Sequence, residues 1–153
     1  MTIDELYRDY PAVLPGRNEM RFLDGWARVL APLLKELSEA GDARLVMAKE
    51  KFGEMRVLLS PPGDERFRDS VECLRLRSRF VCETCGKPGR LRRRSDGWMF
   101  AACDEHEHDV EPLPLSASRC IRWEGTGGRW RTYEYDERDG QITITGPAEG
   151  DEQ

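Results

Sequence analysis

The clearest hydrophobic pattern lies between Glu19 and Ala40, where apolar residues recur at steps of three and four positions. This spacing puts them on one face of an α-helix, which we expect to pack in the core. Gly41 is placed to end the helix. Pro32 should kink the helix or divide it in two, because proline removes a backbone donor and crowds the preceding turn. The apolar positions are Phe22, Leu23, Trp26, Ala27, Leu30, Leu33, Leu34 and Leu37.

Two further helices are predicted from their capping residues. Thr2 with Glu5 three positions later fits a capping box, so a short helix should begin near the N-terminus and end before Pro11. Asp64 follows a Pro-Pro-Gly turn and can cap a helix that runs to about Ser78. Apolar residues share one face of that helix, which leads directly into the cysteine-rich segment.

The segment 43–60 is rich in Val, Leu and Met and is interrupted by Gly53. These features predict two antiparallel strands. In the second strand Met55, Val57 and Leu59 alternate with their neighbours, as expected for a strand with one buried face.

Residues 121–145 read as a β-meander that ends in a hairpin. Asp139-Gly140 is a strong signal for a two-residue type I′ turn, which would fix the register of the flanking strands. The pairs expected from that turn are Tyr135 with Ile144 and Glu137 with Ile142.

These elements predict an α+β fold, with N-terminal helices packed on a small antiparallel sheet, a treble-clef or zinc-ribbon-like knuckle and a C-terminal β-meander. At 153 residues the chain is long enough for one compact domain. Its expected parts are a helical and β-hairpin part (1–79), a zinc-knuckle subdomain (80–110), a β-meander (111–146) and a disordered acidic tail (147–153).

The distribution of charge along the chain indicates which classes of partner the protein can bind. The formal net charge is −5, but residues 66–94 contain ten basic and three acidic residues. A basic middle between acidic flanks can face nucleic acid or an acidic protein. Alternatively, the two signs neutralise each other within the fold.

The N-terminal residues carry three acids and no apolar run, so they do not read as a secretory signal. No stretch approaches the length of a membrane span. We therefore expect a cytoplasmic protein without membrane contact, in which paired cysteines indicate metal binding more than disulfides.

The segment 82–106 contains two ligand pairs, Cys82 with Cys85 and Cys103 with His106, each with two residues between its members. Seventeen residues separate the pairs, a spacing typical of zinc ribbons and related folds. The sequence therefore predicts a zinc site. His108 is the alternative to His106 and would need a wider loop.

Three thiolates and one imidazole fill a tetrahedral zinc site and leave no position for water or substrate, so we expect structural zinc and no catalytic residues. The chain has two histidines, both in this region, and no phosphate-binding glycine loop. A metal-dependent nuclease with a second ion on Asp104, Glu105 and Glu107 is a less favoured alternative.

Three stretches carry a resemblance to a known family: "DGWARVLAPLLKEL", "AKEKFGEMRVLL" and "RSRFVCETCGKPGRLRRRSDGWMFAACDEH". Together they resemble a family of small, uncharacterised bacterial and bacteriophage zinc-knuckle proteins, over about residues 19–107. The resemblance implies the same four metal ligands and does not extend to the C-terminal meander. It marks as motif positions Trp26, Lys51, Phe52, Gly53, Pro88, Gly89, Leu91, Gly97 and Trp98.

The resemblance implies a role in conflict biology, such as toxin immunity or inhibition of a defence system. With it, the sequence predicts a non-enzymatic, zinc-stapled protein-binding module. The alternative is a nucleic-acid-binding regulator that uses residues 66–94. The expected partner-binding residues are Arg92, Arg93, Arg94, Trp98, Arg129 and Trp130, types that dominate interface energies or supply charge.

Overall fold

The chain forms two compact units in the computed structural model, which describes residues 1–107 and 110–147. The first unit comprises residues 1–113, and the second begins at Pro114. Helices and small sheets occur together, and the strands of the second unit form an antiparallel meander, so the predicted α+β class is confirmed.

The N-terminal helix α1 (Ile3–Asp9) forms where its cap predicts. The Thr2 hydroxyl accepts a hydrogen bond from the Glu5 amide, and the Glu5 carboxylate accepts one from the Thr2 amide. Both halves of the capping box are therefore present, and two backbone donors at the helix start are satisfied.

The main helix α2 (Ala27–Ala40) begins later than the hydrophobic pattern predicts. Residues 17–26 instead form two short 3-10 turns and the two-residue strand β1 (Met20–Arg21), which pairs in parallel with a longer strand. Strand pairing uses the backbone groups that a helix would need, so the predicted start at Glu19 is wrong. The predicted division at Pro32 is also wrong, because this exposed proline lies inside one continuous helix. Gly41 ends the helix with φ 77°, as predicted.

Strands β2 (Arg44–Lys51) and β3 (Glu54–Ser60) form the predicted antiparallel hairpin, with β1 on the outer edge of β2. The turn between them is Phe52-Gly53, and both residues have positive φ, 55° and 78°. The left-handed conformation suits glycine but costs about 1–2 kcal/mol for a residue with a side chain. The sequence thus places an aromatic residue where asparagine or glycine is favoured.

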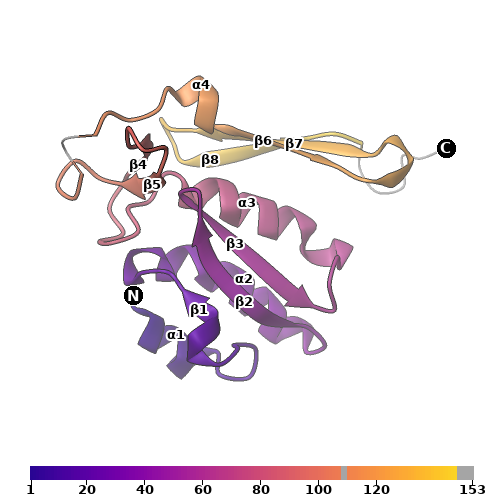
Figure 1. Cartoon of the computed structure of the whole chain (residues 1–153). Coiled ribbons are helices and arrows are strands. Elements are labelled where there is room, and N and C mark those ends of the chain that lie inside the picture. The colour runs from indigo at the N-terminus through magenta and orange to yellow at the C-terminus, as the bar shows by residue number, and fades with distance from the viewer. Residues whose placement is uncertain (108–109, 148–153) are drawn as a thin grey trace. The chain divides into compact units, whose positions relative to one another are not determined.

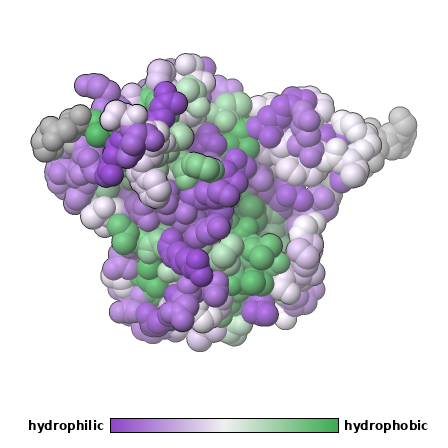
Figure 2. All heavy atoms as spheres, in the orientation of Figure 1, coloured by the Kyte–Doolittle hydropathy of each residue, from purple (hydrophilic) through white to green (hydrophobic). Residues whose placement is uncertain are grey.

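Helix α3 (Arg68–Ser78) follows a 3-10 turn capped by Asp64, as predicted. Helices α2 and α3 contact each other, and each also contacts a strand of the β2–β3 hairpin, so they form a layer against this sheet (Figure 1). The core between them is built from the predicted apolar stripe, with Trp26, Leu30 and Leu34 fully buried. Leu23 is the exception in that stripe and is 53% exposed. In the view of Figure 2 the surface is mostly hydrophilic, with smaller hydrophobic patches between the hydrophilic regions.

A second hairpin, β4 (Arg90–Arg93) with β5 (Met99–Ala102), lies between the two halves of the cysteine-rich segment. It packs closely on the turn of the first hairpin. A Cβ atom added at Gly53 would lie 2.3 Å from Leu91 Cδ1 and 3.1 Å from the backbone nitrogen of Phe100. Glycine at this turn is therefore required by the neighbouring hairpin as well as by its own backbone conformation.

The second unit contains the short helix α4 (Leu115–Ser118) and strands β6 (Cys120–Glu124), β7 (Trp130–Asp136) and β8 (Gln141–Thr145). The strands pair in the order β6-β7-β8, which confirms the predicted meander.

The register of the last hairpin differs from the predicted one. Tyr135 pairs with Ile142, and Asp136 pairs with Gln141, so the predicted pairs are wrong by two residues. The turn has four residues instead of two, because the Asp136 backbone carbonyl accepts the Gly140 amide at 2.8 Å and its carboxylate accepts the Arg138 amide at 2.9 Å. A shift of two keeps every side chain on its predicted face.

Most of the predicted tail, residues 148–153, lies outside the described residues. Within the described part of the chain, none of the helices has the length and apolar content needed to cross a membrane.

Candidate metal centre

The four predicted ligands come together in the first unit. The Sγ atoms of Cys82, Cys85 and Cys103 and a ring nitrogen of His106 all lie within 4.8 Å of one another. Cys82 and Cys103 are buried, whereas Cys85 and His106 are exposed. His108, the alternative ligand, lies outside the described residues. The centre therefore has two ligands held by the core and two at the surface.

The ligand atoms lie close enough together to hold a metal ion such as zinc. Zinc–sulfur bonds of about 2.3 Å put two thiolates about 3.8 Å apart, and a thiolate and an imidazole nitrogen about 3.6 Å apart. In the structure Cys85 Sγ lies 3.7 Å from Cys103 Sγ. His106 Nδ1 lies 3.7 Å from Cys82 Sγ and 3.2 Å from Cys103 Sγ. The four residues thus form a Cys3His group that could hold a metal ion such as zinc.

The first pair of ligands lies on a turn closed by backbone hydrogen bonds. The Gly86 amide donates to the Cys82 carbonyl, and the Cys82 amide donates to the Lys87 carbonyl, each at 2.9 Å. The Lys87 amide also donates to the Cys85 sulfur. This hydrogen bond lowers the pKa of the Cys85 thiol, but burial and the neighbouring thiols together raise it more. The net result is a pKa above the usual value of a cysteine.

The second pair lies on a matching turn, in which the His106 amide donates to the Cys103 carbonyl at 3.2 Å. Burial alone would raise the pKa of the Cys103 thiol. Hydrogen bonds from the His106 ring and from the Glu105 and His106 amides outweigh it and lower the pKa to about 6. Cys103 is thus prepared as a thiolate, the form that binds metal.

Arg28 of α2 and the residues just before this helix hold the first ligand turn in place. The buried Trp26 indole donates to the Val81 carbonyl at 2.8 Å, and the Arg28 guanidinium donates to the Gly86 carbonyl. The Leu23 amide donates to the Glu83 carboxylate at 3.1 Å. A Cβ atom at Gly25 would lie 2.3 Å from two carbonyl oxygens of this turn. The Gly-Trp pair of the sequence therefore acts as a platform for the metal-binding turn.

Arg92 braces the second ligand turn. Its side chain is 3% exposed, and its guanidinium donates to the carbonyls of Ala102, Glu107 and Val110 and to the Asp104 carboxylate, at 2.7–3.1 Å. Five donors in a planar fork can satisfy several acceptors at once, which an ammonium cannot do in the same geometry. Arg92 thus ties the backbone on both sides of Cys103 and His106 to β4.

The acidic residues of the second turn pair with basic residues of the same unit. Asp104 pairs with Arg92, Glu105 pairs with Lys87 at 3.2 Å, and Glu107 pairs with Arg94 at 3.1 Å. The Lys87–Glu105 pair joins the two ligand turns across the site. These carboxylates are occupied by cations of the chain, which gives no support to a second metal ion.

The basic segment is also largely paired. Of its ten basic residues, at least seven form ion pairs within the described part of the chain. The densest group surrounds Glu54, whose carboxylate is 5% exposed and receives the guanidinium groups of Arg56, Arg75 and Arg79. Mutual neutralisation within the fold therefore accounts for most of this charge.

The predicted partner-binding residues fall into three situations. Arg92 is buried, and its guanidinium forms the internal bonds described above. Arg93, Arg94 and Trp98 are exposed in the first unit, and Trp98 is 57% exposed. The other two lie in the second unit and are half-buried: the guanidinium of Arg129 lies 5.6 Å from the Trp123 ring, and that of Arg122 lies 4.8 Å from the Trp130 ring.

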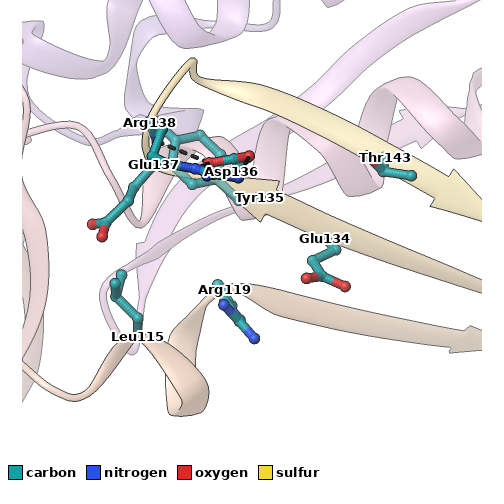
Figure 3. Close-up of a pocket in the computed structure, with 8 residues that line it drawn as sticks. All are labelled: Leu115, Arg119, Glu134, Tyr135, Asp136, Glu137, Arg138 and Thr143. Carbon is teal, nitrogen blue, oxygen red and sulfur yellow. Dashed lines mark hydrogen bonds and ion pairs between the residues drawn. The ribbon is translucent and has the colours of Figure 1, made fainter.

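The second unit has its own hollow, of about 380 Å³, around Arg119, Glu134 and the turn before β8 (Figure 3). Its walls are charged, and the Asp136 carboxylate is paired with Arg138 at 3.1 Å. The side chains shown place opposite charges close together.

Sequence reasoning missed two structural roles at the metal centre. The sequence does not distinguish Arg92 from its neighbours, because residues 90–94 are four arginines and one leucine. The bracing role of Arg92 could therefore not be predicted. Gly25 directly precedes Trp26, which is a motif position. This adjacency is the sequence feature from which a close contact at Gly25 could have been predicted.

No family model matches the chain, and neither a curated protein nor a solved structure matches it.

Proposed function

We propose that this chain is a non-enzymatic protein-binding module whose fold is stapled by one structural zinc ion. The observation that carries the proposal is the Cys3His group, whose four protein ligands would fill a tetrahedral zinc site. Hydrogen bonds from α2, from β4 and within both ligand turns support it. An ion in such a frame holds chain segments together and has no free position for substrate.

Protein binding is supported by two large aromatic side chains that are exposed on the zinc-stapled unit. The β2–β3 and β4–β5 hairpins expose Phe52 at 60% and Trp98 at 57%. Large aromatic side chains on rigid turns are typical of interface anchors, because little conformational entropy is lost when they are covered.

Two observations weigh against the alternatives. A nucleic-acid-binding surface needs cations free to neutralise phosphates, whereas at least seven of the ten basic residues in 66–94 already pair with acids of the described chain. A nuclease needs carboxylates free to hold an ion, whereas Asp104, Glu105 and Glu107 each pair with a base. The immunity or defence-inhibitor role stays a prediction from the resemblance.

The structural role of zinc is tested by changing a ligand. Cys82→Ser and Cys103→Ser should each lower the bound zinc well below one per chain and lower the melting temperature, because metal binding of this type is coupled to folding. Native mass spectrometry and thermal unfolding provide the measurements. Cys120→Ser is the matched control, since Cys120 is an exposed cysteine of the other unit. One retained zinc and an unchanged melting curve in the ligand variants would show that the ligand assignment is wrong.

The binding role is tested by capture from a bacterial lysate at low and moderate salt, with absorbance for nucleic acid and mass spectrometry for protein. A stoichiometric protein partner that survives moderate salt is the expected result. Captured nucleic acid that is lost as salt rises, without a protein partner, would favour the regulator.

A further inference from the structure

A hollow of about 420 Å³ lies between the turns of the two hairpins in the first unit. It is lined by residues 50–52 from the first hairpin and 96–99 from the second. Both turns are held in place. Gly53 packs tightly against β4 and β5, and the Arg94 amide closes the second turn by donating to the Trp98 carbonyl at 2.9 Å. The hollow is therefore part of the rigid frame that the metal centre supports.

Two aromatic side chains line this hollow and remain open to solvent. Phe52 is 60% exposed and Trp98 is 57% exposed. They are the two aromatic residues among the large, exposed hydrophobic residues of the described chain. Burial of an aromatic ring is favourable, so a ligand that covers these two solvent-facing rings would gain binding free energy.

The position of Phe52 adds a second observation. Its φ of 55° lies in the left-handed region, where a bulky side chain is strained and asparagine or glycine would be favoured. The ring is mostly exposed, so it gains little from packing in return for that strain. Strained conformations that bring no stability to the fold are found mainly at functional sites.

The charges around the hollow indicate the kind of ligand. Two carboxylates line it, Glu50 and Asp96, against one ammonium, Lys51. Each carboxylate uses one oxygen to hold its turn, through the amides of Gly53 and Trp98 respectively, both at 2.9 Å. The Lys51 ammonium lies 5.6 Å from the Phe52 ring centroid, so a cation already approaches this ring from within the chain. Aromatic faces together with an excess of negative charge fit a cation.

We propose that this hollow, defined by Phe52, Trp98, Glu50 and Asp96, binds an arginine side chain of the partner protein. The planar guanidinium stacks on the Trp98 and Phe52 rings and pairs with the carboxylates, a combination that a lysine ammonium matches less well. This inference rests on the proposed protein-binding function and specifies its surface and the chemistry of its partner.

The direct test is an NMR titration of the zinc-loaded, ¹⁵N-labelled full chain with N-acetyl-arginine amide. The Trp98 indole signal and the amides of Phe52, Gly53 and Gly97 should shift with saturation. N-acetyl-lysine amide should give a weaker effect, and N-acetyl-leucine amide should give none. Equal shifts with the leucine compound would show an apolar site and overturn the arginine assignment, as would arginine shifts spread over the whole surface.

Variants separate the site from the fold. Phe52→Asn places a favoured residue in the turn, so it should keep or raise the melting temperature while it lowers arginine affinity by about two- to fivefold. Trp98→Ala should lower the affinity similarly, and Asp96→Asn, which can still accept the Trp98 amide, should weaken binding and its salt dependence. Leu58→Thr is the matched control, since Leu58 is 46% exposed on β3 outside the hollow. Unchanged affinity in the first three variants would overturn the proposal.

Capture of a protein partner distinguishes this proposal from the broader one. If wild-type protein captures a partner and Phe52→Asn and Trp98→Ala capture it equally well, the binding module stands and this surface is wrong. If no partner is captured while arginine binds as described, the site stands and the proposed function fails.

Discussion

At the scale of single residues, neighbouring arginines of identical chemistry have different roles. Arg92 is buried and satisfies three backbone carbonyls and one carboxylate around the second ligand turn. Arg93, the next residue on β4, is exposed, although Leu91 on the other side of Arg92 is buried. The neighbours that pack on each position, and not residue type, therefore decide which arginine supports the metal centre.

This difference predicts that Arg92→Lys lowers zinc affinity by about 10- to 100-fold, because one ammonium cannot replace the guanidinium fork that orients the ligand turn. Competition with a chromophoric chelator measures the affinity. Arg93→Lys is the matched control and should bind zinc as the wild type does. Equal affinities in both variants would contradict a positioning role for Arg92.

At the scale of elements, the metal centre depends on contacts between segments far apart in sequence. The residues before α2 approach the first ligand turn so closely that only glycine fits at position 25. The Trp26 indole and the Arg28 guanidinium then bond to carbonyls of the same turn. The hydrophobic core of the helical layer is therefore linked to the metal-binding turn by hydrogen bonds and close packing.

From this contact we predict that Gly25→Ala destabilises the protein by about 1–3 kcal/mol, since the added methyl group must displace backbone carbonyls. Urea unfolding at constant zinc gives the free energy. Gly16→Ala provides the comparison, because nothing lies within 4 Å of a Cβ atom at Gly16, and its effect should stay within about 0.5 kcal/mol. Similar stabilities for the two variants would refute the close contact.

At the scale of the whole molecule, the first unit contains hydrophobic cores of very different size. The large core of helices and the β1-β2-β3 sheet contains Trp26 and most of the leucines. The small core around the metal centre comprises, among the described residues, Cys82, Ala102 and Cys103, with Phe100 packed against it. A core of that size cannot offset the conformational entropy of the ligand turns without the ion.

Zinc removal should therefore unfold the protein unevenly. On addition of EDTA, hydrogen exchange measured by mass spectrometry should rise in residues 80–107 while α2 and the β2–β3 hairpin keep most of their protection, because local stability follows local burial. Restoring zinc should restore the protection. A uniform rise over the first unit would instead show that the ion stabilises the whole unit as one cooperative system.

Much of this protein was determined by sequence alone, through local chemistry. The spacing of Cys82, Cys85, Cys103 and His106 predicted the ligand set, since two tight turns present such residues in pairs. Capping residues and periodicity located α1, α3 and the β2–β3 hairpin, because these signals act over a few neighbouring positions.

Tertiary structure decided what depends on distant partners. Residues 20–21 left the helical pattern because β2 offers them strand pairing, and the last hairpin changed register because Asp136 closes a longer turn than Asp139-Gly140 alone would form. Only the fold determined that Arg92 is buried and that Phe52 and Trp98 meet at one hollow. Sequence spacing reports neighbours along the chain, whereas burial, pairing and charge neutralisation depend on which segments meet in space.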